Sequence, residues 1–375
     1  MNPGKVLFVF GTRPEAIKMA PVIKLFQKHS DRFDVKVGVT AQHREMLDQV
    51  LTFFEIEPDF DLNVMKKGQG LVPLSSAILD GLQLVFDEQK PDAVFVQGDT
   101  TTCTIASIAA FYSDIRVYHI EAGLRTLNKY SPYPEEVNRQ ITARVADVHF
   151  APTQSTKQNL LDEGIPPSDI WVTGNTVIDA LLLGKEKLKE YQSTILDEMM
   201  RIIKPDKKLI LVTGHRRESF GDGFQEICLA LAELSKRKDI QIVYPVHLNP
   251  NVQQPVYDLL KDTENIHLIN PLGYAEFLWL MNQAYLILTD SGGIQEEAPS
   301  LNKPVLVMRD TTERMEVIES GGAKLVGTSS WKIVKEVNSL LDNKKHYEAM
   351  CSSENPFGDG LASKRILEVV LEKLI

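Results

Sequence analysis

The feature that most constrains the fold is a pattern that recurs along the chain: an apolar run, a short polar turn, and then a helical segment. The pattern appears at residues 5–15, 93–100, 117–125, 209–217 and 286–293. Short apolar runs that alternate with helical segments predict βαβ units and a parallel sheet. In such a sheet the carboxyl ends of the strands border the ligand crevice, so the five turns predict one binding site. Their charged and small residues suit a phosphorylated, negatively charged small molecule.

The order of these segments predicts two domains in a chain of 375 residues. Expected strands and helices alternate over the first half until the pattern breaks near residue 172, and a second alternating set begins at 209–212. We therefore expect an α/β protein of two Rossmann-like, doubly wound domains, at 1–172 and 173–360, with the active-site cleft between them. A final helix at about 361–375 is free to pack back on the first domain.

Composition limits the partners of the chain. The formal net charge of −10 leaves no surplus of Lys and Arg for a nucleic-acid backbone, so we expect no nucleic-acid partner. The three cysteines are far apart and lack the spacing of zinc ligands, which fits a reduced cytosol and predicts no metal site. No run approaches the roughly 18 apolar residues that span a bilayer, and no signal-peptide pattern precedes the first strand. We expect a cytoplasmic protein without a membrane partner.

The sequence also argues against common cofactors. Its Gly-x-Gly occurrences lack the third glycine of the dinucleotide fingerprint, and no phosphate-loop motif is present. NAD and ATP are therefore disfavoured, and we expect no cofactor.

The turn at Ser291, Gly292 and Gly293 has the chemistry of a phosphate site. Glycine lets the backbone approach a ligand closely, and free N–H groups at a helix start bind phosphate oxygens. Glu297, four residues after Gly293, can accept hydrogen bonds from ribose hydroxyls. The alternative is an ordinary helix cap with a solvated acidic first turn.

Two cations belong to the first turn. Pro14 suits the first helical position, which leaves Arg13 at the helix entrance as a candidate phosphate ligand. Lys18 lies one helical turn after Pro14, and a solvated helix residue is its alternative interpretation.

Carboxylates follow two apolar runs that are expected to be neighbours in the sheet. Asp99 and Glu121 lie just past these runs, and converging carboxylates can divide acid and base duties when their environments separate their pKa values. A helix cap before Thr100 is the alternative for Asp99. Glu135 begins a helix after two prolines and precedes Arg139 by four residues, a spacing that also fits an exposed ion pair.

His215 lies beyond an apolar run and next to two arginines. A histidine in this setting can bind a diphosphate or donate a proton to it as it leaves. A structural or solvated histidine is the alternative, and it is the default interpretation for His43, His247 and His267.

The turns belong to longer motifs that point to one family. The motifs are Gly-Thr-Arg-Pro-Glu-Ala-Ile-Lys-Met-Ala-Pro at 11–21, Thr-Ala-Gln-His-Arg at 40–44, Gly-Asp-Thr-Thr at 98–101, Glu-Ala-Gly-Leu-Arg at 121–125, Pro-Glu-Glu at 134–136, Gly-Asn-Thr-Val-Ile-Asp at 174–179, Gly-His-Arg-Arg-Glu at 214–218 and Asp-Ser-Gly-Gly-Ile-Gln-Glu-Glu-Ala-Pro at 290–299. Together and in this order they resemble the non-hydrolysing bacterial UDP-N-acetylglucosamine 2-epimerases. Gln97 and Tyr133 depart from the pattern, which usually has histidine and tryptophan there.

The resemblance implies a glycosyltransferase-B architecture, a homodimer, and reversible conversion of UDP-N-acetylglucosamine to UDP-N-acetylmannosamine without metal or nicotinamide. The implied route is anti-elimination of UDP to 2-acetamidoglucal followed by re-addition, and the product would supply surface polysaccharides.

The resemblance also assigns residues to roles. Its implied catalytic set is Asp99, Glu121, Glu135, Arg139 and His215. The implied UDP-sugar ligands are Arg13, Lys18, Phe277, Ser291, Gly292, Gly293, Glu297 and Arg314. Some members bind a second UDP-N-acetylglucosamine as an activator, and the corresponding allosteric residues here are Gln42, His43 and His247.

Three other functions compete with this interpretation. A hydrolysing epimerase would begin with the same elimination and release free N-acetylmannosamine and UDP. A glycosyltransferase on the same fold would need an acceptor, because fold does not determine function. A nucleotide-sugar sensor would bind UDP yet tolerate the loss of Asp99, Glu121 and Glu135.

Overall fold

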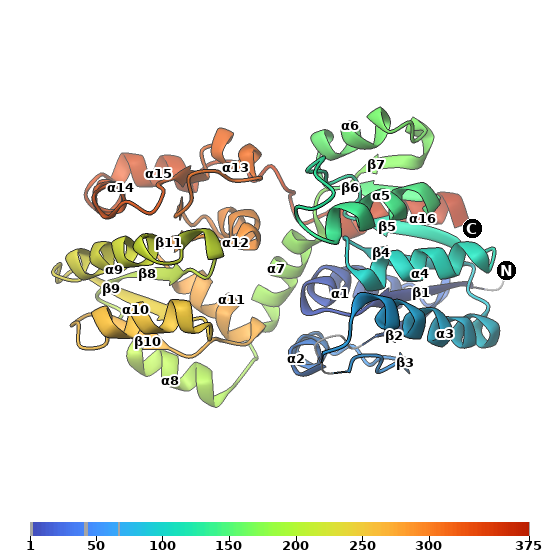
Figure 1. Cartoon of the computed structure of the whole chain (residues 1–375), viewed down its shortest axis with the longest axis horizontal. Helices are drawn as coiled ribbons and strands as arrows, with labels where there is room; N and C mark the ends of the chain where they lie inside the picture. The colour runs from blue at the N-terminus through green and yellow to red at the C-terminus, as the bar shows by residue number, and fades with distance from the viewer. Residues whose placement is uncertain (1–2, 41–43, 67, 375) are drawn as a thin grey trace. The chain divides into compact units, whose positions relative to one another are not determined.

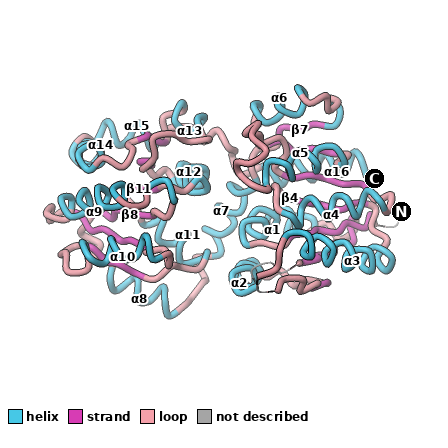
Figure 2. Tube along the Cα trace, viewed as in Figure 1, coloured by secondary structure: helices cyan, strands magenta, loops and turns pink. Residues whose placement is uncertain are grey.

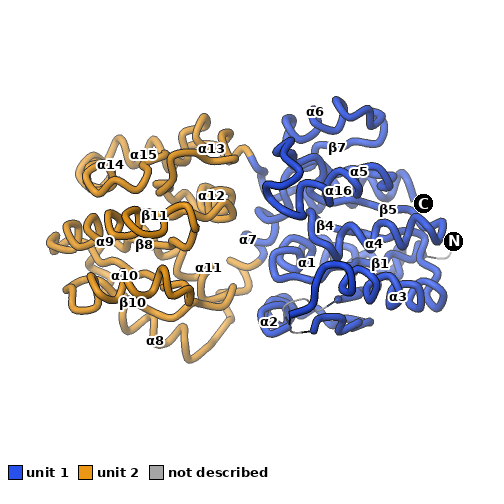
Figure 3. Tube along the Cα trace, in the orientation of Figure 1, with its two compact units in different colours: residues 1–183, 357–375 blue, residues 184–356 orange. Residues whose placement is uncertain are grey.

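The computed structural model shows two compact units, each built on one parallel sheet with helices on both faces (Figure 1). The structure describes residues 3–40, 44–66 and 68–374. Unit 1 comprises residues 1–183 and 357–375, and unit 2 comprises residues 184–356 (Figure 3). The expected α/β class with two Rossmann-like sheets is therefore confirmed.

Unit 1 contains a seven-stranded parallel sheet of order β3-β2-β1-β4-β5-β6-β7. The order reverses between β1 and β4, so the turns after these two strands lie side by side at the carboxyl edge. The elements are β1 (Gly4–Phe10), α1 (Arg13–Gln27), β2 (Phe33–Val39), α2 (Arg44–Phe54), β3 (Phe60–Asp61), α3 (Leu71–Gln89), β4 (Ala93–Gln97), α4 (Thr101–Tyr112), β5 (Arg116–Ile120), α5 (Glu135–Val145), β6 (Val148–Ala151), α6 (Gln154–Asp162), β7 (Ile170–Val172), α7 (Thr176–Lys187) and α16 (Ala362–Leu374).

Unit 2 contains a six-stranded parallel sheet of order β10-β9-β8-β11-β12-β13, which reverses between β8 and β11 (Figure 2). Its elements are α8 (Thr194–Ile202), β8 (Lys208–Thr213), α9 (Asp222–Leu234), β9 (Ile240–Pro245), α10 (Pro250–Leu260), β10 (Ile266–Ile269), α11 (Tyr274–Gln283), β11 (Leu286–Thr289), α12 (Gly292–Glu297), β12 (Val305–Val307), α13 (Met315–Glu319), β13 (Ala323–Leu325), α14 (Ser330–Asp342) and α15 (Lys344–Cys351).

The central strands are apolar because helices cover both of their faces. β1 and β4 alternate side chains between two buried layers, which is why they read as continuous apolar runs rather than as alternating ones. On one face Phe8 stacks on Phe95 at 4.6 Å between ring centroids, and Phe26 of α1 meets Phe8 edge-on at 5.6 Å. This core holds the strands rigidly and leaves their carboxyl ends to the polar turns.

Contacts of α7 show to which unit its first residues belong. The Asp179 carboxylate accepts hydrogen bonds from the backbone N–H groups of Ala362 and Ser363, at 3.2 and 2.7 Å. These bonds tie α7 to the start of α16, which packs against α1. Residues 173–183, placed in the second domain by the sequence interpretation, thus belong to unit 1 together with the final helix.

Among the residues that the structure describes, no helix is long and apolar enough to cross a bilayer.

Candidate active site

Glu121 is held in a strained conformation at the carboxyl end of β5. Its φ of 63° lies in the left-handed region, which is uncommon for a residue with a side chain and persists only where the surroundings impose it. Lys18 Nζ and Gln97 Nε2 both donate to Glu121 Oε2 at 2.5 Å. The carboxylate is almost fully buried, and it is partnered by one cation and one neutral donor. Lys18 is therefore a partner of Glu121 rather than a solvated helix residue.

The turn after β5 also explains why glycine stands two residues after Glu121. Gly123 has a φ of 92°, and a Cβ on it would lie 2.2 Å from the carbonyl oxygen of Thr156. Only glycine fits there, because the turn packs directly against the backbone of α6. The position of Glu121 thus depends on a contact with the next layer of the fold.

Asp99 follows β4 and is paired with Arg139 of α5. Arg139 Nη2 lies 2.7 Å and Nε 2.9 Å from Asp99 Oδ2. Arg139 Nη1 also contacts Glu136 Oε2 at 3.2 Å, and Asn138 Nδ2 donates to the Asp99 carbonyl at 2.8 Å. A guanidinium therefore lies between two carboxylates, and the expected alternative of a Glu135–Arg139 ion pair is not what forms.

Glu135 stands apart from this pairing. The half-buried side chain has its Oε2 atom shielded from solvent, and among the described residues that atom has no hydrogen-bond partner. Because buried polar atoms are nearly always bonded, an unpartnered carboxylate oxygen in the same helix as Arg139 marks a position where a ligand can bind.

Glu15 joins the turn after β1 to the turn after β4. Its Oε2 accepts from the backbone N–H groups of Gly11 and Thr12 at 3.0 and 2.8 Å, and its Oε1 accepts from Thr100 Oγ1 at 2.6 Å. Burial raises the pKa of Glu15, and these hydrogen bonds oppose the rise. Arg13 begins α1 immediately after this braced turn.

His119 of β5 bonds to the backbone of the turn that carries Asp99. Its Nε2 lies 2.8 Å from the carbonyl oxygen of Gly98, and because a carbonyl only accepts, Nε2 carries the proton. Burial lowers the pKa of His119 to about 4. His149 is its neighbour in register on β6, where burial and the His119 charge lower its pKa to about 3.

In unit 2 a second set of predicted residues gathers at the carboxyl ends of β8 and β11. Asp290 Oδ2 accepts from the backbone N–H groups of His215 and Arg216 at 2.7 and 2.8 Å. Burial raises the pKa of Asp290, but hydrogen bonds from His215 and Arg216 outweigh it and hold the pKa below its ordinary value. His215 Nδ1 lies 3.3 Å from Asp290 Oδ1, and the His247 ring stacks on His215 at 5.4 Å.

The glycine turn of unit 2 is closely covered by Arg314. A Cβ on Gly292 would lie 2.9 Å from the guanidinium carbon of Arg314, so any larger residue there would require the Arg314 side chain to shift. Arg314 Nε donates to Glu296 at 2.9 Å. Ser291 makes no side-chain cap bond to α12, and a Cβ on Gly293 would lie 3.5 Å from Glu297 Oε1. The Ser291 N–H donates to Thr289 Oγ1 at 2.9 Å, so the turn combines the backbone N–H groups of Gly292 and Gly293 with a cation and a carboxylate.

Comparison with known proteins decides the family. The sequence profile described as UDP-N-acetylglucosamine 2-epimerase matches residues 26–371. The chain is 58% identical over 369 residues to the UDP-N-acetylglucosamine 2-epimerase of Escherichia coli strain K12, with 98% of each chain covered. This chain belongs to the UDP-N-acetylglucosamine 2-epimerase family.

Solved structures agree with this assignment. The chain is similar to the UDP-GlcNAc 2-epimerase of Neisseria meningitidis bound to UDP-GlcNAc, with a TM-score of 0.88, 53% identity, and coverage of 98% of this chain and 100% of that one. It is also similar to a putative UDP-N-acetylglucosamine 2-epimerase from Listeria monocytogenes, with a TM-score of 0.91, 47% identity, and coverage of 99% and 96%.

Within this 2-epimerase family member, the predicted residues fall into two groups. Unit 1 brings Lys18, Asp99, Glu121, Glu135 and Arg139 to one sheet edge, with Arg13 at the start of α1. Unit 2 brings His215 and His247 together, and it holds Ser291, Gly292, Gly293, Glu297 and Arg314 around one turn. Phe277 is half-buried on α11, which packs against β8. Gln42 and His43 lie outside the described residues, so the proposed allosteric set stays a prediction.

Sequence reasoning missed five supporting residues: Glu15, Gln97, His119, Glu136 and Asp290. One of them had a readable signal, because Glu15 is the third helical residue after Thr12 and completes a capping box. Gln97, His119 and Asp290 act through contacts between segments far apart in the sequence, whereas Glu136 bonds to residues 3 to 10 positions away.

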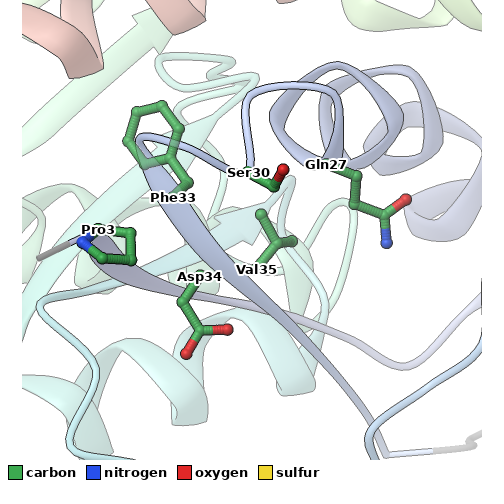
Figure 4. A pocket seen from close by; sticks show the side chains of 6 residues that line it. All are labelled: Pro3, Gln27, Ser30, Phe33, Asp34 and Val35. Carbon is green, nitrogen blue, oxygen red and sulfur yellow. The ribbon is translucent and has the colours of Figure 1, made fainter.

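A hollow of about 370 Å³ lies elsewhere on this family member, lined by Pro3, Gln27, Ser30, Phe33, Asp34 and Val35 (Figure 4). These residues surround the amino ends of β1 and β2, whereas the candidate site uses the carboxyl ends. Within the described chain no group of three or more His, Cys, Asp and Glu is placed to hold a metal ion.

Proposed function

We propose that this chain interconverts UDP-N-acetylglucosamine and UDP-N-acetylmannosamine without hydrolysis, and that the reaction supplies surface polysaccharide precursors in the cytoplasm. Membership of the 2-epimerase family supports the substrate. The observation that carries the chemistry is the set of carboxylates at one edge of unit 1. Asp99 and Glu121 are each held by a cation there, and Glu135 has an unpartnered buried oxygen.

The chemistry of the sugar explains why several carboxylates are needed. The proton on C2 is poorly acidic, and no carbonyl adjoins C2 to stabilise a carbanion. Anti-elimination of UDP avoids the carbanion because the C2–H electron pair forms the C1–C2 double bond of 2-acetamidoglucal as the C1–O bond to UDP breaks. Re-addition of UDP then returns a proton to the opposite face of C2, which requires proton-transfer groups that serve both faces.

Unit 1 residues carry the proton transfers in this proposal. Asp99, Glu121 and Glu135 form the proton-transfer set, and the order in which they act stays open. Lys18 and Arg139 hold two of these carboxylates in position through ion pairs. Preorganised charge of this kind lowers the barrier because it needs no rearrangement as the reaction proceeds.

Unit 2 residues hold UDP and stabilise its departure. The backbone N–H groups of Gly292 and Gly293 and the Ser291 hydroxyl suit phosphate oxygens, and Arg314 adds a positive charge beside them. Glu297 suits the ribose hydroxyls, and Phe277 lines the uridine side. In this proposal His215 of unit 2 stabilises the departing diphosphate, and Arg13 of unit 1 has the same role; a chain of net charge −10 can attract a diphosphate only through local cations.

The decisive test follows the sugar by proton NMR in deuterated water, with chelator present and without NAD. UDP-N-acetylmannosamine carrying deuterium at C2 supports the proposal and its freedom from metal. Free N-acetylmannosamine would identify a hydrolysing epimerase instead. An unchanged spectrum would leave the transferase and the sensor, which an added acceptor distinguishes.

We also propose a homodimer formed through α3 and α4 of unit 1. These helices pack against each other and expose large apolar side chains to solvent. The exposed residues are Val72 at 82%, Leu84 at 72%, Phe111 at 58% and Tyr112 at 77%. Light scattering after gel filtration should give a dimer for the wild type and a monomer for Phe111→Glu, while a monomeric wild type would refute the interface.

A further inference from the structure

We propose that Glu136 is a positioning residue that aims Asp99 through Arg139 and locks the loop at 124–131 to the same point. The inference rests on the proposed epimerase reaction, since it assigns a role at that site. Glu136 follows Glu135 directly in the sequence, yet the two carboxylates have different environments. Glu135 has an unpartnered oxygen, whereas every hydrogen-bonding direction of Glu136 is engaged within unit 1.

Glu136 is buried, and both of its carboxylate oxygens are bonded. Its side chain is completely inaccessible to solvent. Oε2 accepts from the backbone N–H of Thr126 at 2.9 Å and from Arg139 Nη1 at 3.2 Å, and Oε1 accepts from Leu127 N–H at 3.2 Å and from Gln140 Nε2 at 3.1 Å. Burial raises the pKa of Glu136, but the bonds from Thr126, Gln140 and Leu127 outweigh it and hold the pKa below its ordinary value. Glu136 is therefore a buried anion.

Arg139 connects Glu136 to Asp99 through its guanidinium. Its Nε and Nη2 atoms both bond to Asp99 Oδ2, at 2.9 and 2.7 Å, while Nη1 points at Glu136. A planar guanidinium that is bonded on two edges cannot rotate, so its orientation fixes that of the Asp99 carboxylate. Because both bonds end on Oδ2, Asp99 Oδ1 takes no bond in this network.

Glu136 also anchors the loop at 124–131. Thr126 and Leu127 donate consecutive backbone N–H groups to the carboxylate, and Leu127 has a φ of 61°. The loop then exposes Leu127 and Tyr130, at 85% and 71%, and Tyr133 just beyond it is 65% exposed. It leads directly into Glu135, so one carboxylate holds the approach to Glu135 and the orientation of Asp99 together.

A second buried ion pair in the chain provides a matched control for the role of Glu136. Glu163 makes a bidentate pair with Arg125 at 2.6 and 2.8 Å, and the Arg125 side chain is also buried. Arg125 lies one residue before Thr126, but this pair contacts neither Arg139 nor Asp99. Loss of Glu163 therefore removes a comparable structural interaction from the same loop and leaves the aim of Asp99 intact.

The test measures steady-state epimerisation by Glu136→Gln, Glu163→Gln, Arg139→Lys and the Glu136→Gln/Arg139→Lys double variant. Glutamine keeps the size of Glu136 but turns an amide N–H₂ group toward one of its donors. We expect Glu136→Gln to lower kcat by about 10- to 100-fold, with KM changed less than about threefold, as displaced catalytic groups do. Glu163→Gln should lower the melting temperature and leave kcat within about twofold, because its pair is remote from the reacting groups.

The double variant separates positioning from a merely structural role. If Glu136 acts through Arg139, its loss should add little once Arg139 is already lysine, so the two effects on kcat should be strongly non-additive. Additive effects, or a Glu136→Gln variant with wild-type kcat, would overturn the inference. Glu136→Asp, which keeps the charge with a shorter reach, should recover part of kcat and provides the test if Glu136→Gln does not fold. An inactive wild type would instead refute the proposed function.

Discussion

Unit 1 and unit 2 place β1 and β8 at corresponding positions in their sheets, with β4 and β11 beside them. In each unit a buried carboxylate closes the turn after the first of these strands. Glu15 accepts from the N–H groups of Gly11 and Thr12, and Asp290 accepts from those of His215 and Arg216. Glu15 reaches its turn from the following helix, whereas Asp290 reaches across from the neighbouring strand. The same topology thus needs the same brace and obtains it from different segments.

The residues beyond the brace differ between the units. Unit 1 carries three carboxylates, two of them paired with cations and one with an unpartnered oxygen, and this set suits proton transfer. Unit 2 carries a glycine turn beneath Arg314, which suits an anionic ligand. The comparison teaches that topology decides where side chains gather and that turn residues decide what chemistry occurs there.

The largest expected effect tests this division of labour. Asp99→Asn and Glu121→Gln should each lower kcat by about 10²- to 10⁴-fold, the usual contribution of a positioned acid or base. UDP affinity by calorimetry should stay within about threefold of wild type, because the backbone donors of unit 2 are intact. His215→Ala should follow the same pattern, since it removes a group that assists the departing diphosphate.

The reciprocal change belongs to unit 2. Gly292→Ala should weaken UDP binding by about tenfold or more, because its Cβ would lie 2.9 Å from the Arg314 guanidinium and displace it. Glu57→Gln, an exposed substitution, is the control and should change neither quantity. Wild-type turnover in Asp99→Asn and Glu121→Gln would break the division between the units.

The second prediction concerns stability in acid, where unit 1 should fail first. The pKa values of His119 and His149 are lowered to about 4 and about 3, while an unfolded histidine titrates near 6.5. A depressed pKa means that the unfolded state binds the proton more tightly below pH 6.5. The contribution of these two histidines to stability is therefore complete above pH 6.5. It is lost as the pH falls toward 4 for His119 and toward 3 for His149. His119 alone contributes on the order of 3 kcal/mol to this loss.

The tryptophans allow each unit to be read separately. Trp171 lies in unit 1, and Trp279 and Trp331 lie in unit 2. Urea unfolding at pH 7 and pH 5 should lower the Trp171 transition more than the other two. His119→Gln should reduce the difference, because glutamine does not titrate. Glu15, with its raised pKa, gains stability as the pH falls and so opposes the trend in part. Equal losses in both units would contradict the prediction.

Much of the fold could be predicted from the sequence because parallel strands buried on both faces leave a local signal. The apolar runs at 5–10 and 93–97 correspond to the strands β1 and β4. The turns Gly98-Asp99-Thr100 and Ser291-Gly292-Gly293 carry local chemistry that was readable in the same way. The contact of α7 with the final helix α16 was harder to predict from the sequence. It depends on hydrogen bonds from Ala362 and Ser363, more than 180 positions later in the chain, to Asp179.

The partners of the catalytic groups could not be predicted, since they come from different strands and helices. Nothing near Glu121 in the sequence indicates that Gln97 and Lys18 share its Oε2 atom. Spacing favoured Glu135 as the partner of Arg139, but the helix start directs Glu136 toward Arg139 instead. Side-chain direction on the first turn of α5 decides this choice, and a one-residue difference lies below what spacing can resolve.

The smallest expected effect compares the two braces. Burial raises the pKa of Glu15, so the folded protein disfavours its charged form at pH 7, and a neutral isostere relieves that cost. Hydrogen bonds lower the pKa of Asp290, so the fold favours its charge. Glu15→Gln should therefore change the unfolding free energy of unit 1 by less than about 1 kcal/mol, and Asp290→Asn should destabilise unit 2 by about 1–3 kcal/mol. Trp171 fluorescence reads the first change and Trp279 with Trp331 the second. A larger loss for Glu15→Gln than for Asp290→Asn would show that donor count, rather than charge, determines what each brace contributes.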